Sequence, residues 1–160
     1  MAITFKITGD RELALYLGRA SSGIKKQIYS GLDDIGEHLQ KKVKEKFGTY
    51  QSGWPKLKRA SVIAKYRKRA LKGIKTGARK IAFTVGADDP LVLFGNLEKS
   101  IQKEVNKTAM QTIVFSDNVY AAVHEYGYKQ IPARSYMRLT LSDETNEVIK
   151  ILDAKIGRII

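Results

Sequence analysis

The sequence predicts an α+β domain, in which a small antiparallel sheet packs against a long N-terminal helix and a C-terminal helix. Three observations predict this class. Apolar residues recur every three or four positions from about residue 24 to 47, and they do so again after Ser142. Between these stretches, apolar and polar residues alternate on both sides of a short polar turn. The length of 160 residues suits a single domain, residues 1–160.

The N-terminal part is expected to hold one strand and two helices. Residues 2–7 alternate apolar and polar, which is the period of a strand with one apolar face. A helix is expected next, through Leu13 and Leu17. The longer helix, at about 24–47, has Lys, Asp and Glu opposite a continuous apolar stripe. That stripe comprises Ile24, Ile28, Leu32, Ile35, Leu39 and Val43.

The middle of the chain is expected to be mostly irregular. Glycines and a proline interrupt any regular pattern at 48–57, which predicts a loop. A short helix then begins at Ser61, its expected N-cap, and ends near Leu71. The thin apolar stripe of this helix comprises Ile63, Tyr66 and Ala70. Residues 72–90 are expected to form a loop, which could include a short strand at 81–85.

The C-terminal half is expected to alternate short strands and helices. The expected elements are a helical turn at 96–100, a hairpin of strands 101–105 and 110–115, a helix at 119–126, a last strand at 135–141 and a terminal helix capped by Ser142. The terminal helix has acids in its first turn and bases near its end, as the helix dipole favours. Its expected buried stripe comprises Val148, Leu152, Ile156 and Ile159.

The composition excludes several classes of protein. The chain has no cysteine, which rules out disulfides and thiolate metal sites. Its start lacks a basic region followed by an apolar run, so no signal peptide is expected. No apolar stretch approaches the ~20 residues that a membrane helix needs, so no membrane contact is expected.

All of the excess positive charge lies in one quarter of the chain. The net charge is +13, and Lys41–Lys80 holds 15 Lys or Arg with one acid, Glu45. This asymmetry favours a polyanionic neighbour, either nucleic acid or an acidic protein surface, although a solvated basic loop explains it equally well. The cations expected to face such a partner lie in a basic insertion at about 56–89. They are Lys56, Lys58, Arg59, Lys65, Arg67, Lys68, Arg69, Lys72, Lys75, Arg79 and Lys80.

Three segments carry recognisable motifs. The first, 50–57, contains Gly-Trp-Pro-Lys-Leu. The second, 90–101, contains Leu-Val-Leu-Phe-Gly-Asn-Leu-Glu-Lys-Ser-Ile. The third, 119–137, contains Tyr-Ala-Ala-Val-His-Glu-Tyr-Gly and then Pro-Ala-Arg-Ser-Tyr-Met. Each motif alone is weak, but their order and spacing together are fairly specific.

Taken in this order, the segments resemble the virion-morphogenesis, or tail-completion, family of tailed bacteriophages and the wider group of head–tail joining proteins. That family has a Gly-Trp-x-x-Leu loop, a Leu-x-x-x-Gly-x-Leu-x-x-Ser-Ile segment, and Tyr-Ala-x-x-His-x-x-Gly followed by Pro-Ala-Arg. The resemblance spans about residues 50–137, and the long basic stretch at 67–89 departs from it. The residues that carry it are Gly53, Trp54, Leu57, Leu91, Gly95, Leu97, Ser100, Ile101, Tyr120, Ala121, His124, Glu125, Gly127, Pro132, Ala133 and Arg134.

The resemblance implies a structural virion protein that is not an enzyme. Copies of the chain would form a ring, in many cases a hexamer, at the neck between the head connector or adaptor and the tail terminator or tail tube. Genomic DNA would pass through this ring. The protein would be assembled in the host cytoplasm and located in the virion, and the motif residues would help to hold its subunits together.

The motif residues read as architecture more readily than as chemistry. Trp54 beside Pro55 could anchor in a pocket of its own domain or of a neighbour. Glu125 is expected to pair with Arg134 across the intervening turn, which would fix that loop or join two subunits. His38 and His124 lack further ligands at metal-site spacing, so no metal or cofactor is expected. No nucleophile elbow or phosphate-binding loop is present, so no catalytic residue is expected.

A basic nucleic-acid-binding module is the alternative function. Tyr50, Trp54 and Tyr66 lie among the positive charges and could serve as stacking platforms for bases. This alternative predicts tight, salt-sensitive binding of DNA by the isolated monomer.

Overall fold

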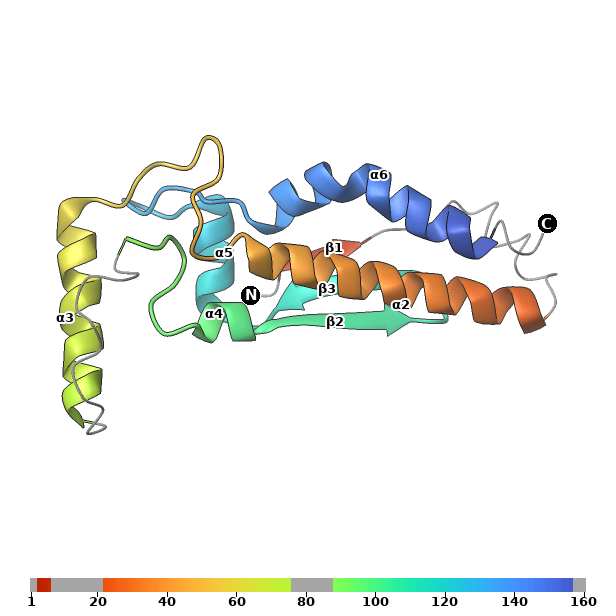
Figure 1. Ribbon diagram of the computed structural model, residues 1–160, viewed down its shortest axis with the longest axis horizontal. Coiled ribbons are helices and arrows are strands. Elements are labelled where there is room, and N and C mark those ends of the chain that lie inside the picture. The colour runs from red at the N-terminus through yellow and green to blue at the C-terminus, as the bar shows by residue number, and fades with distance from the viewer. Residues whose placement is uncertain (1–2, 7–21, 76–87, 157–160) are drawn as a thin grey trace.

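The computed structural model of the chain describes residues 3–6, 22–75 and 88–156. A three-stranded antiparallel sheet lies against one long helix, and the C-terminal helix runs beside that helix in the opposite direction (Figure 1). The elements are β1 (Ile3–Lys6), α2 (Ser22–Glu45), α3 (Arg59–Lys75), α4 (Asn96–Lys99), β2 (Ile101–Asn106), β3 (Gln111–Ser116), α5 (Val119–Tyr126) and α6 (Met137–Ile156). The predicted α+β class and its packing are therefore confirmed.

Helix α2 supplies the largest share of the core. Five residues of its predicted stripe are buried, and the sixth, Ile24, is partly buried against Ile28 and Leu32. The buried five are Ile28, Leu32, Ile35, Leu39 and Val43. The helix comes unusually close to the sheet at Gly36, where a Cβ atom would lie 2.6 Å from the Thr112 hydroxyl oxygen. A larger side chain there would push α2 away from β3.

The sheet has the strand order β1-β3-β2, with every pair antiparallel. The hairpin register pairs Ile101 with Ser116 and Asn106 with Gln111. Successive side chains of a strand point to opposite faces, and Ile101 and Val114 are buried under α2. The predicted first strand and hairpin are both confirmed, each within a residue or two at its ends.

The predicted strand at 135–141 is wrong, and so is the predicted helix start at Ser142. Helix α6 begins at Met137, and Ser142 lies inside it. The reason is a cap that comes from another element: the Glu125 carboxylate of α5 accepts hydrogen bonds from the first backbone N–H groups of α6. Of the predicted stripe, Val148 is buried and Leu152 packs against the core, while Ile159 lies outside the described residues.

The predicted short basic helix is longer than expected. Helix α3 begins at Arg59, two residues before Ser61, and it continues through the predicted glycine stop to Lys75. Of its thin apolar stripe, Ile63 is 42% exposed, whereas Tyr66 and Ala70 are half-buried. The predicted helix through Leu13 and Leu17 and the predicted strand at 81–85 lie outside the described residues.

Candidate functional site: the junction of three motif segments

The three motif segments meet at one end of the molecule, where α3, α4 and α5 lie near the loops that connect them (Figure 1). The Arg134 guanidinium donates to the Pro55 carbonyl at 2.7 Å, which joins the third segment to the first. The Gly48 amide, two residues before the first segment, donates to the Pro90 carbonyl at 3.1 Å. Side chains of all three segments pack in the main core cluster, among them Trp54, Leu97 and Tyr136. We call this region the motif junction.

The loop at 50–57 is held by hydrogen bonds within the loop itself. The Trp54 amide donates to the Gln51 carbonyl at 3.1 Å, and the Leu57 amide donates to the Tyr50 hydroxyl at 2.9 Å. The Tyr50 hydroxyl in turn donates to Asp88 at 3.0 Å. Trp54 is partly buried against the main core of its own chain. Of the two expected settings for Trp54, the structure therefore shows packing within its own domain.

The second segment, 90–101, is built for packing. Pro90, Leu97 and Ile101 are buried, and Leu91 packs against the core. Gly95 precedes α4 with a φ of 76°, which a glycine adopts at no steric cost. The Ser100 hydroxyl donates to the Leu97 carbonyl at 2.7 Å and lies 2.7 Å from the Ser116 hydroxyl. The motif serine thus ties the end of α4 to β3.

The third segment runs through α5 and a tight loop. The Asn118 side chain caps α5 by accepting a hydrogen bond from the Tyr120 amide at 2.9 Å. Ala121 and Glu125 are buried, while Tyr120 is exposed. Gly127 ends the helix, and a bridge between Tyr128 and Ile131 closes the loop. Pro132 and Ala133 lie exposed on that loop.

The predicted ion pair between Glu125 and Arg134 is wrong. The Glu125 carboxylate, which is fully buried, accepts from the backbone N–H groups of Tyr136, Met137 and Arg138 at 2.9–3.0 Å. It also accepts from the Arg138 side chain at 3.2 Å. A carboxylate is the group that the positive N-terminal end of a helix favours. Sequence reasoning missed Arg138 because it placed this residue in a strand.

Arg134 is 4% exposed and lacks the acid that was expected for it. Its side chain donates to the Pro55 carbonyl, and its backbone amide donates to the His124 carbonyl at 2.7 Å. Its Nε atom is buried and has no hydrogen-bond partner among the described residues. Burial lowers the pKa of the Arg134 guanidinium, which nonetheless stays charged at neutral pH. Arg134 therefore joins the third segment to the first, at the expense of a buried charge.

Three basic side chains influence one another at the junction: Lys65, His124 and Arg134. Burial lowers the pKa of His124, and the charges of Arg134 and then Lys65 lower it further. Burial also lowers the pKa of Lys65 to about 8, with the charge of Arg69 as the next cause. The His124 imidazole is therefore neutral at pH 7, because protonation would add a cation where two already lie.

We expect the stability of the protein to fall as the pH drops below about 6.5, through His124. The pKa of this group is lower in the folded chain than in the unfolded chain, so the unfolded chain binds the proton first. The loss stops below the folded pKa, and its slope cannot exceed about 1.4 kcal/mol per pH unit for one proton. Urea unfolding of the wild type and of His124→Gln between pH 7.5 and 5 measures it. Parallel stability curves for the two proteins would contradict the expectation.

The predicted partner-facing cations divide into two groups. Lys65 and Arg69 are half-buried and contact the backbone of the loop at 88–95. Lys65 donates to the Asp89 carbonyl, while Arg69 donates to the Leu93 carbonyl at 2.9 Å and to the Val92 carbonyl at 3.1 Å. The exposed group comprises Lys56, Lys58, Arg59, Arg67 and Lys68. The backbone of Lys72 and Lys75 belongs to α3, and Arg79 and Lys80 lie outside the described residues.

A patch of large exposed apolar and aromatic side chains covers α5 and the loop after it. It comprises Val119, Tyr120, Tyr126, Tyr128 and Ile131, which are between 42% and 67% exposed. Cations lie over two of its rings: Arg138 is 4.7 Å from the centre of the Tyr126 ring, and Lys129 is 5.2 Å from that of Tyr128. Tyrosine and arginine are enriched where proteins contact one another. We call these five residues the aromatic patch.

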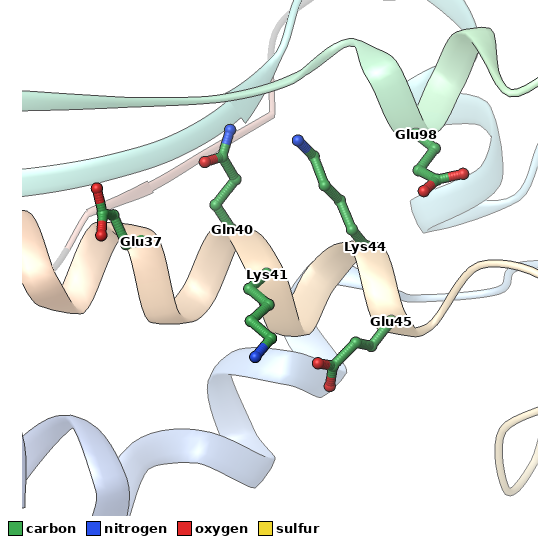
Figure 2. A pocket seen from close by; sticks show the side chains of 6 residues that line it. All are labelled: Glu37, Gln40, Lys41, Lys44, Glu45 and Glu98. Carbon is green, nitrogen blue, oxygen red and sulfur yellow. The ribbon is translucent and has the colours of Figure 1, made fainter.

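An open groove of about 450 Å³ lies between α2 and α4 (Figure 2). Its charged lining combines three carboxylates with two ammonium groups. The lining residues are Glu37, Gln40, Lys41, Lys44, Glu45 and Glu98. Gln40 donates to the Ile101 carbonyl at 2.8 Å, which ties the floor of the groove to the edge strand β2.

Among residues 3–6, 22–75 and 88–156, no group of three or more His, Asp or Glu side chains could hold a metal ion. None of the helices in these ranges is both long enough and apolar enough to cross a membrane. Comparisons with protein-family models, with curated proteins and with solved structures found no match to the chain.

Proposed function

We propose that the chain is a structural virion protein of a tailed bacteriophage, a tail-completion subunit that forms a ring at the joint of head and tail. The observation that carries the proposal is the motif junction. Three segments that are separated in the sequence, and that together resemble the tail-completion family, contribute side chains to one core cluster, and Arg134 of the third donates to the Pro55 carbonyl of the first. Their motif residues act there as packing, turn and capping groups, as expected of a protein that works through its shape.

The aromatic patch supports a role in assembly. Its five large apolar or aromatic side chains are all exposed on α5 and the following loop, and clustered exposed apolar side chains mark contacts between proteins. The patch lies on a rigid support, because α5 is capped by Asn118 and the following loop is held by the contact of the Arg134 amide with the His124 carbonyl. A preformed surface loses little conformational entropy on binding.

The proposed partners are further copies of the chain, the head connector or adaptor, and the tail terminator or tail tube. The ring is a hexamer in the form that the resemblance favours, with genomic DNA in its lumen. The protein is assembled in the host cytoplasm, and it acts in the virion neck without catalysing a reaction. The exposed cations Lys56, Lys58, Arg59, Arg67 and Lys68 then face either the DNA or an acidic surface of a neighbouring protein.

Electron microscopy of the purified protein tests the proposal most directly. We expect closed rings, and we expect lysates of a phage that lacks the protein to accumulate heads and tails that are not joined. A protein that stays a single subunit, alone and with the neck proteins of its phage, would contradict the proposal.

Nucleic-acid binding by the monomer is the second candidate, and one observation favours it. Five cations among residues 56–68 are exposed, and they lie at the same end of the folded molecule as α5 and its exposed tyrosines. A gel-shift titration with DNA at two salt concentrations separates the candidates. Tight binding by the monomer that weakens steeply with salt favours the nucleic-acid module, whereas weak binding together with self-association favours the ring subunit.

A further inference from the structure

Helix α3 stands apart from the core of the molecule. It lies across the direction of α2, at the end of the molecule beyond α5 (Figure 1). None of its residues belongs to either core cluster of the described chain. Lys65 and Arg69 hold it in place by donating to backbone carbonyls of the loop at 88–95. A helix of 17 residues is only marginally stable in water by itself, so these contacts fix one face of α3.

The face of α3 that points away from this loop is largely apolar. Its exposed residues recur every three or four positions, as residues on one side of a helix do. We call these residues the outward face of α3: Ala60, Ile63, Ala64, Arg67 and Leu71. Ile63 is 42% exposed and Leu71 is 59% exposed. A helix that adds nothing to the described core therefore holds two large apolar side chains in solvent.

Cations lie on and beside the outward face. Arg67 is one helical turn from Ile63 and one turn from Leu71. The exposed Arg59 and Lys68 are next to residues of the same face in the sequence. The helix holds seven Lys or Arg and no acid, so no carboxylate within it can neutralise these charges. A surface that covers the outward face must therefore combine apolar area with anionic groups.

A second copy of the chain is a poor match for the outward face. Two α3 helices repel each other, because each carries seven cations and no acid. The aromatic patch already has cations over two of its rings. The groove between α2 and α4 is mixed in charge, since Lys41 and Lys44 line it, and two of its three carboxylates pair with lysines of their own chain at 3.0 and 3.3 Å. A different molecule is therefore the better partner.

The apolar side chains distinguish a protein partner from nucleic acid and from lipid. The phosphates of DNA attract the cations, but they leave Ile63 and Leu71 in a polar setting. An anionic membrane accepts apolar side chains, but its affinity grows with the buried apolar area, and two large side chains provide little. A protein groove with an apolar floor and carboxylates at its rim matches both the apolar and the basic residues of the face, as in other contacts between a helix and a groove.

We propose that the outward face of α3 docks into an apolar groove, rimmed with carboxylates, on a different protein of the virion neck. Ile63 and Leu71 enter the groove, and Arg67 between them pairs with a carboxylate through two parallel hydrogen bonds. Arg59 and Lys68 meet further carboxylates at the rim. This inference rests on the proposed function, because it names the surface through which the ring meets a neighbouring protein.

Two variants test the docking face, with the purified head connector and tail terminator of the same phage as binding probes. The apolar variant, Ile63→Ser with Leu71→Ser, keeps the charge of α3, and the charge variant is Arg67→Glu with Lys68→Glu. We expect each variant to bind one of the two probes roughly tenfold more weakly than the wild type does. We expect both to form rings as the wild type does, because the outward face does not join copies of the chain. Circular dichroism establishes that each variant is folded.

The matched controls are Ile149→Ser for the apolar variant and Lys107→Glu with Lys150→Glu for the charge variant, since these side chains are exposed on other elements. We expect both controls to bind the probes as the wild type does. If either test variant keeps wild-type affinity for both probes, the docking contact is overturned while the ring stands. A wild type that binds neither probe, or that binds a DNA duplex or phosphatidylserine vesicles instead, overturns the contact too. A wild type that forms no ring overturns the proposed function.

Discussion

Glu125→Gln is expected to destabilise the protein by about 3 kcal/mol, because it places the NH₂ group of an amide against buried N–H groups that lose their acceptor. The two carboxylate oxygens of Glu125 accept four hydrogen bonds: one from the backbone N–H of Tyr136, just before α6, two from the first backbone N–H groups of α6, and one from the Arg138 side chain. An amide keeps one oxygen and places an NH₂ group against two of these donors. It also removes the negative charge that faces the positive end of α6.

Urea unfolding measures the change, as a lower midpoint at an unchanged slope. Glu147→Gln is the matched control, because Glu147 lies on the same helix α6 in an exposed pair with Lys150 at 3.1 Å. We expect the control to change stability by less than about 0.5 kcal/mol. A cost at Glu125 no larger than that of the control would mean that solvent or another group caps α6, contrary to the structure.

The long elements could be predicted from the sequence, because their signals are local. The apolar stripe from Ile28 to Val43 fixes which face of α2 is buried, and the alternation on either side of 107–110 fixes the hairpin. The start of α6 could not be predicted in the same way. Its cap, Glu125, precedes Met137 by 12 residues and belongs to another helix. Ser135 lies two residues before Met137, but its hydroxyl donates to the Glu125 carbonyl, whereas Ser142 offers a local capping signal that the fold does not use.

The roles of the basic residues also depended on tertiary structure. Lys65, Arg67, Lys68 and Arg69 look alike in the sequence, but only Lys65 and Arg69 reach the carbonyls of the loop at 88–95. Helical spacing alone places Lys65 and Arg69 on one face, four residues apart. The face of α3 that meets the rest of the protein was set by loop carbonyls 23 or 24 residues further along the chain than the cations that contact them, and the thin apolar stripe was too weak to indicate that face.

Gly127→Ala is expected to lower the free energy of unfolding by about 3 kcal/mol, and Gly53→Ala by about 1 kcal/mol. Both glycines have φ values near +78°, where an alanine is strained by roughly 1–2 kcal/mol. Their surroundings differ. A Cβ atom at Gly53 would meet nothing within 4 Å, whereas one at Gly127 would lie 2.9 Å from the Ala133 amide nitrogen and 3.1 Å from the Ile131 carbonyl oxygen. Gly127 also has a ψ of 157°, a combination that is essentially confined to glycine.

The atoms that crowd Gly127 belong to the backbone of the loop that carries Tyr128 and Ile131, so that loop must move to admit a methyl group. Gly127→Ala should therefore weaken assembly as well as folding, because it displaces part of the aromatic patch. Gly53→Ala should lower stability slightly and leave assembly unchanged. Denaturant unfolding of the two variants measures the loss of stability from backbone strain. Sedimentation of the same variants measures whether displacement of the loop weakens assembly. An equal loss in the free energy of unfolding for the two variants would show that the loop after α5 moves easily to admit the methyl group. It would then not be a rigid support for a partner.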